Sequence, residues 1–295
     1  MAGGSTAYSL ALRAAITLAA FAWISRVVDL GALRAALSGA DTGLLSAAIA
    51  IFLFIQALSI ARWKLLLPAG SALGWGSLGE SFCVAAFFNS VLPTTIGGDG
   101  MRAYDLIRAN GDWRSSIARI FVERLMGLTA LAAMAGAAFC LFPPARRDPA
   151  LGLGLLALCG AAAAFLGLLA SRRAVRTFLL PFERGSLIGI SEQAGRFQDA
   201  ILDYRSRLGA VAAAFSLALT IHAGTILVYV LVAAALSIDV PALLLALAVP
   251  IALLAAQLPL SLAGWGVREG ATILLLKDFG VSPAEALSLS LLCAV

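Results

Sequence analysis

The chain has 295 residues, of which 61% are hydrophobic and only 13% are charged, and its mean hydropathy is +0.97. No ordinary soluble domain has this composition, so the sequence indicates an integral membrane protein. Apolar runs near the ~20 residues that span a bilayer recur along it, which favours helices over the ~10-residue alternating strands of a barrel. The net charge of +5 suits an anionic lipid surface, and the spacing of the basic residues does not suggest nucleic acid as a partner.

The first part of the chain alternates apolar runs with short polar segments. In chain order we expect spans at about 7–24 and 44–67, an entering half-helix at 78–92, a break at 93–100, a returning half-helix at 101–109 and a span at 115–142. We interpret the two half-helices and their break as a re-entrant hairpin that begins and ends on one side of the membrane. The first apolar run lacks the basic leader and small-residue exit of a cleavable signal, so we expect a retained helix.

The second part begins after a proline-rich turn at 143–149, which ends the preceding span. Its predicted elements are a span at 151–170, a polar segment at 171–208, a span at 209–237, half-helices at 241–257 and 267–279, and a last apolar run at 283–295. Apolar residues repeat every three or four positions among the charges of the polar segment, which predicts an amphipathic helix on the cytoplasmic membrane surface. The last run stops abruptly at Val295, so we expect a final span that is either truncated or only marginally complete.

A motif at the first break recurs at the second. The run from Leu92 to Arg102 matches the run from Leu258 to Arg268, with identical residues at 92/258, 93/259, 98/264, 100/266 and 102/268. Lipid cannot hydrogen-bond free backbone groups, so a broken helix at membrane depth survives only inside protein or beside a polar cavity. Two broken helices in corresponding places therefore point to a transport site.

Three predicted spans separate the two breaks, so the hairpins should open to opposite sides of the membrane. The repeat elements, at about 78–142 and 241–295, would then be inverted, an arrangement that permits alternating access. Basic residues gather on the side to which the first hairpin opens, which makes that side the cytoplasm. We expect an all-α polytopic fold, with one transmembrane domain over residues 1–295.

Arg102 and Arg268 open the returning half-helices, where free N–H groups and the helix dipole favour an anion. An arginine there could clamp a lipid phosphate through two hydrogen bonds. The alternative is that each arginine pairs with Asp105 or Glu269, or caps a neighbouring helix. A charge near the bilayer centre costs at least ~2.5 kcal/mol, which favours the functional interpretation.

The other candidate headgroup-binding residues lie in or beside the two breaks. They are Asn89, Gly98, Asp99, Gly100, Gly264, Trp265 and Gly266, with Gln257 as a further residue that could line the cavity. The glycines permit unusual backbone angles and close helix approach. Turn chemistry favours Asp beside Gly, and we prefer this role for Asp99 over recognition of a cationic headgroup.

A second group of charged residues could form a coupling site or structural ion pairs. Its members are Arg119, Glu123, Arg124 and Glu269. Arg119 and Glu123 have the i, i+4 spacing of a helical ion pair, which either stabilises the fold or belongs to a headgroup or proton path. For His222, the only histidine, we expect a hydrogen bond between helices rather than proton coupling.

The sequence predicts neither a metal site nor a cofactor. The four cysteines lie singly in apolar runs, without a CxxC pair or a histidine neighbour. The acidic residues named above also lack metal-ligand spacing.

Four motifs in the same order resemble the membrane domain of lysyl-phosphatidylglycerol synthase/flippase proteins. They are 89–93 (NSVLP), 97–102 (GGDGMR), 122–125 (VERL) and 259–270 (PLSLAGWGVREG). The resemblance covers nearly the whole chain and implies a polytopic domain that moves a lipid between leaflets. In bifunctional members a soluble C-terminal aminoacyl-transferase makes the lipid. We see no such domain, so we expect a stand-alone version without synthase activity.

The function that we expect from the sequence is a lipid flippase or scramblase in a bacterial inner membrane, for an anionic or modified phospholipid or another polar lipid. Arg102 and Arg268 would receive the headgroup from opposite leaflets. Two alternatives are a membrane enzyme that acts on a lipid phosphate, which needs a base or metal that the sequence does not offer, and a scaffold. Beyond membrane lipids, the sequence leaves open a separate lipid-modifying enzyme and a second copy of the chain as partners.

Overall fold

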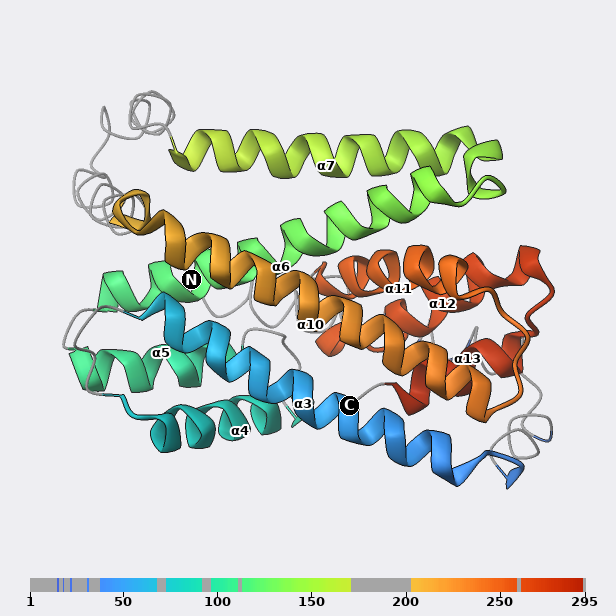
Figure 1. Cartoon of the computed structure of the whole chain (residues 1–295), viewed down its shortest axis with the longest axis horizontal. Helices are drawn as coiled ribbons and strands as arrows, with labels where there is room; N and C mark the ends of the chain where they lie inside the picture. Colours follow the sequence, from blue (N-terminus) through green and yellow to red (C-terminus); the bar gives the residue numbers. More distant parts are fainter. Residues whose placement is uncertain are drawn as a thin grey trace.

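The computed structural model describes residues 38–67, 73–91, 97–110, 113–170, 203–258 and 261–293, together with residues 15, 18, 22 and 31 (Figure 1). All regular structure in these ranges is helical, as predicted. The predicted span at 7–24 and the polar segment at 171–202 lie outside them, apart from the single residues just named. At the end of that segment, Asp203–Arg207 form a short 3-10 helix.

Within the described residues, three helices are long and apolar enough to cross a membrane. They are α3 (Thr42–Leu66), α6 (Trp113–Leu141) and α10 (Leu208–Ala235), close to the predicted spans. Asp41 caps α3, because its carboxylate accepts hydrogen bonds from the backbone N–H groups of Gly43 and Leu44. A further helix, α7 (Pro149–Ala170), begins at the last proline of the predicted turn and packs on α6.

The first predicted hairpin consists of α4 (Trp75–Val91) and α5 (Gly97–Asn110), which pack against each other. The second consists of α11 (Ala242–Gln257) and α12 (Val267–Leu276), and α13 (Pro283–Leu292) follows it. A capping box of Ser282 and Glu285 starts α13. Figure 1 shows α4 and α5 at one end of the molecule's long axis and α11, α12 and α13 at the other. The two broken elements therefore lie toward opposite ends of this axis, and the long helices α3, α6 and α10 extend between them.

The long helices pack through small residues, as expected where lipid removes the hydrophobic drive for association. Helix α10 runs along α3, and α6 contacts both. At the crossing of α3 and α10, a Cβ atom on Gly224 would lie only 2.5 Å from Cγ2 of Ile55. The apolar core around Tyr229, Leu245 and Leu276 lies on the side of the second hairpin.

Side chains from other elements hold the C-terminal end of α3. Arg119 Nη1 and the Tyr204 hydroxyl donate to the Leu66 carbonyl oxygen over 3.0 and 2.9 Å, and Arg207 Nη2 donates to the Leu65 carbonyl over 3.2 Å. Burial raises the pKa of Tyr204, so the phenol keeps its proton and remains a donor at neutral pH. These bonds satisfy the last carbonyls of the helix and fix α3 against α6 one turn from Arg62.

Candidate functional site: a cavity between the two broken hairpins

Both broken elements contribute to one cavity of about 450 Å³. From the first hairpin the lining includes Asn89 at the end of α4, and Asp99 and Arg102 near the start of α5. From the second it includes Gln257 at the end of α11, together with Gly264, Trp265 and Arg268. The long helices complete the lining with polar and apolar side chains, among them Ser59, Arg62, Glu123, Arg124, Leu128, Ile221 and His222. Segments far apart in sequence thus meet at the residues that the repeated motif singled out.

Some predicted site residues do not line the cavity. Gly98, Gly100, Gly266, Arg119 and Glu269 are absent from its lining. A Cβ atom on Gly98 would lie 2.3 Å from the Ala85 carbonyl oxygen, so this glycine lets α5 approach α4 closely. Gly98 N–H also donates to Asn89 Oδ1 over 2.9 Å. A Cβ atom added to Gly100 would meet nothing within 4 Å, and no role for this glycine follows from the geometry.

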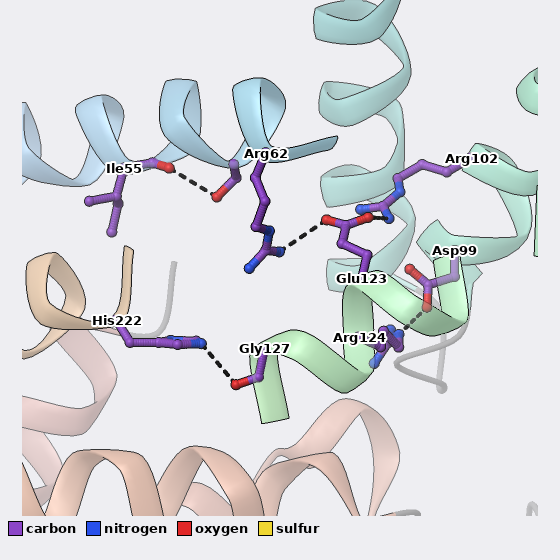
Figure 2. A network of polar contacts seen from close by, with 9 residues as sticks. Ile55, Arg62, Asp99, Arg102, Glu123, Arg124, Gly127 and His222 are labelled. Atoms are coloured by element: carbon purple, nitrogen blue, oxygen red, sulfur yellow. Dashed lines mark hydrogen bonds and ion pairs between the residues drawn. The ribbon is translucent and has the colours of Figure 1, made fainter. Parts of the chain in front are cut away.

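Glu123 stands between two arginines from different elements (Figure 2). Its side chain is 3% exposed; Oε1 accepts from Arg62 Nη2 over 3.0 Å, and Oε2 accepts from Arg102 Nη2. Arg102 is 8% exposed, and its guanidinium also lies over the Trp63 ring, 4.8 Å from the centroid. One carboxylate on α6 therefore joins α3 to α5.

Two predictions about these charges are wrong. The carboxylate of Glu123 binds Arg62 and Arg102 instead of Arg119, because the Arg119 side chain reaches along α6 to the end of α3. Arg102 does not open its half-helix, because α5 already begins at Gly97; it also pairs with Glu123 rather than with Asp105, which accepts from Ser81. The start of α5 therefore lies about one turn from Arg102, close to Asp99.

Arg124 connects the two hairpins. Its Nε donates to Asp99 Oδ2 in the first turn of α5, and its Nη1 donates to Gln257 Oε1 at the end of α11 over 3.1 Å. Asp99 thus takes part in a helix and an ion pair, and the preferred interpretation as a turn residue is wrong. A carboxylate in the first turn also suits the helix dipole.

The second hairpin holds its arginine locally. Arg268 is the second residue of α12 and donates to Glu269 Oε1 through Nε over 3.0 Å and Nη2 over 2.5 Å. The other carboxylate oxygen accepts from the Gly266 N–H over 2.6 Å, so the fully buried Glu269 both neutralises Arg268 and caps the helix. The Arg268 guanidinium lies 5.3 Å from the centroid of the Trp265 ring. This arrangement is the alternative to anion binding that the sequence left open.

The backbone of the second break has the unusual angles that its glycines predict. Gly264 and Gly266 have φ values of 80° and 81°, and Ala263, just before Gly264 in the motif, has φ 51°. Gly98 and Gly100, their counterparts in the first motif, lie within α5 and have no positive φ. The two motifs are therefore alike in sequence and different in backbone at these positions.

His222 and Arg62 also line the cavity. His222 Nε2 donates to the Gly127 carbonyl oxygen over 3.2 Å, which joins α10 to α6 as expected (Figure 2). Arg62 was missed as a site residue, because it lies near the predicted end of a span, where an interfacial arginine is common. The sequence signal that could have identified Arg62 is a charged residue one turn before the end of an apolar helix.

The cavity can receive an anion beside an apolar group. Four arginines and two carboxylates line it, and Phe82, Leu128, Leu131 and Ile221 add apolar surface. Within the described ranges, no group of three or more His, Cys, Asp and Glu side chains is placed to hold a metal ion. The lining thus combines the two chemical characters of a lipid, a charged headgroup and a hydrocarbon chain.

Comparison with known proteins places the chain in a family. No curated protein and no solved structure matches it. A family model described as lysylphosphatidylglycerol synthase TM region matches residues 10–295, nearly the whole chain. The chain therefore belongs to this family, and it is a membrane protein linked to lipid modification or transport.

Proposed function

We propose that this protein moves a lipid with an anionic headgroup between the two leaflets of a membrane, as a flippase or scramblase. The observation that carries the proposal is the shared cavity, to which each broken hairpin contributes one motif arginine, Arg102 or Arg268. Guanidinium groups suit phosphate because they donate parallel hydrogen bonds. The apolar part of the lining suits the first carbons of the acyl chains, while the rest of each chain stays in the bilayer.

The arrangement of the hairpins supports alternating access as the mechanism. We propose that the two repeat elements, about 78–142 and 241–295, are inverted in a bacterial inner membrane. Helices α4 and α11 then end, and α5 and α12 begin, near the middle of the bilayer from opposite sides. The ends of α4 and α11 contribute Asn89 and Gln257 to the same cavity, which fits this placement.

Transport by purified protein in vesicles tests the proposal. Vesicles of phosphatidylcholine would contain fluorescent phosphatidylglycerol, and a membrane-impermeant reductant would report the fraction in the outer leaflet over time. We expect wild-type protein to accelerate the movement of this lipid and leave it chemically unchanged. Arg102→Gln and Arg268→Gln should each slow the movement, because losing a charge-assisted contact weakens binding by ~1.5–3 kcal/mol, about tenfold or more. Arg108→Gln, at an exposed position of α5 away from the cavity, is the matched control.

The same experiment separates the competing functions. A membrane enzyme acting on a lipid phosphate would use the same arginines but change the lipid, which mass spectrometry of the recovered lipid detects. A scaffold for a lipid-modifying partner would neither move nor change it. Unaltered movement in both Gln variants would remove these arginines from the transport mechanism.

A further inference from the structure

The positive charge of the cavity is not evenly compensated. Arg124 faces Asp99, and Arg268 faces Glu269, so each of these pairs is neutral. Arg62 and Arg102 instead share Glu123, which leaves the cluster of these three residues with one excess positive charge. When the described charged residues of the cavity lining are counted with their ion-pair partners, the excess positive charge therefore lies at this cluster. The two motif arginines are therefore not equivalent as receptors for an anion.

The hydrogen bonds of the cluster are also incomplete. The Nε atoms of Arg62 and Arg102 are buried and have no hydrogen-bond partner among the described residues. The Arg102 side chain is 9% exposed and the Arg62 side chain 12%, so water satisfies these donors poorly. Buried donors without partners are costly, and a ligand that accepts from them recovers that cost. Figure 2 shows both guanidiniums directed toward the Glu123 carboxylate from opposite sides.

Building on the proposed function, we propose that the Arg62–Glu123–Arg102 cluster is the headgroup site and that it selects a phosphodiester with a single negative charge. One such charge neutralises the cluster. A net-neutral zwitterionic lipid would leave the excess in place, and a doubly charged phosphomonoester would replace it with an excess of the opposite sign. Either imbalance is unfavourable in a cavity of low dielectric.

A binding titration on purified full-length protein in detergent micelles tests the cluster directly. The probes are phosphatidylglycerol, phosphatidylcholine with the same acyl chains, and glycerophosphoglycerol, which is the headgroup without chains. We expect phosphatidylglycerol to bind about tenfold or more tightly than phosphatidylcholine. Glycerophosphoglycerol should bind more weakly than the lipid; equal affinity would overturn the lipid as the source of the phosphodiester.

Changes of net charge distinguish the proposal from a structural ion pair. Arg62→Gln and Arg102→Gln each leave one neutral pair, so each should weaken phosphatidylglycerol binding by about tenfold or more and remove its preference over phosphatidylcholine. The double variant Arg62→Gln/Glu123→Gln restores one positive charge and should restore the preference. Arg108→Gln on the same helix as Arg102 should bind like wild type. The preference, measured on folded protein as a ratio of two affinities, does not depend on the yield of each variant.

Two results would overturn the headgroup site: an unchanged lipid preference in Arg62→Gln, or a double variant that binds no better than Arg62→Gln alone. Transport in vesicles is scored separately on the same proteins. If the lipid preference does not depend on the cluster while transport persists, the headgroup site is wrong and the transporter stands. If the expected charge pattern holds but wild-type protein moves no lipid, the site stands and the transport function is wrong.

Discussion

The two hairpins carry the same motif, yet they neutralise its arginine in different ways. In the second hairpin, Arg268 pairs with its chain neighbour Glu269, which also caps α12. In the first, Arg102 pairs with Glu123 on another helix and shares it with Arg62 on a third. The second arginine is thus part of a local, neutral unit, whereas the first belongs to a tertiary cluster with excess positive charge. Repetition of a sequence motif therefore does not imply repetition of its electrostatics.

The largest expected effect follows from removing the shared carboxylate. Glu123→Gln leaves two buried guanidiniums without their counter-ion and should destabilise the protein by about 3–5 kcal/mol, measured by unfolding in detergent. Arg62→Gln or Arg102→Gln in the same chain should recover part of this loss. Recovery by Arg119→Gln instead would contradict the cluster, because Arg119 bonds the end of α3.

The corresponding change in the second hairpin should be fully local. Glu269→Gln leaves one arginine without its counter-ion and weakens one helix cap. Its cost in unfolding free energy should therefore be smaller than that of Glu123→Gln. Adding Arg268→Gln should recover most of it, since no third charge shares this carboxylate in the described structure. A double-mutant cycle on the unfolding free energies measures the coupling. The two hairpins would not differ in this respect if Glu269→Gln/Arg268→Gln remained as destabilised as Glu123→Gln/Arg102→Gln.

Glycine-to-alanine substitutions test the difference in backbone conformation between the two motifs. Gly264→Ala should cost about 2–4 kcal/mol, because Gly264 has φ 80° and an added Cβ would lie 2.8 Å from the Ala256 carbonyl oxygen. Gly98→Ala should cost less, about 1–3 kcal/mol: the added Cβ would lie 2.3 Å from the Ala85 carbonyl oxygen and 2.7 Å from the Asn89 side-chain amide, but Gly98 has no positive φ that an alanine would strain. Gly100→Ala is the control and should be neutral or stabilising by up to about 1 kcal/mol, since its position is helical and open. Thermal unfolding of the three variants gives the order.

The smallest expected effect on stability concerns the link between the hairpins. Arg124 is about one-third exposed, so Arg124→Gln should change the unfolding free energy by about 1 kcal/mol or less. A distance measurement between spin labels on α5 and α11 should nevertheless show a broader distribution, because the variant removes the ion pair with Asp99. An unchanged distribution would show that the two hairpins are held together without this residue.

The helices were predictable because their signals are local. Apolar length, Pro149, and the proline and glycine breaks placed α3, α6, α7, α10 and the half-helices within a few residues. The i, i+1 pair of Arg268 and Glu269 was also visible as an alternative. Both depend on neighbours in the chain, which sequence reasoning can evaluate.

The partners of Glu123 were not predictable in the same way. Its local neighbour Arg119 has the right spacing, but the preference is worth only a few tenths of a kcal/mol and tertiary contacts override it. The bond to Arg62 joins positions 61 residues apart and depends on how α3 crosses α6. Arg62 itself resembles an interfacial anchor until α3 is packed beside the cavity. The sequence motifs therefore located the cavity, whereas its charge balance came from packing.

The hairpins can serve alternating access only if they open to opposite sides of the membrane, and cysteine labelling measures this directly. In a chain without its four native cysteines, single cysteines would replace Arg108 on α5 and Asp278 after α12, both of which are exposed. An impermeant maleimide should label position 278 from outside intact cells, and position 108 only after the membrane is opened. Labelling of both positions from the same side would contradict the inverted arrangement and, with it, transport by exchange between two opposed hairpins.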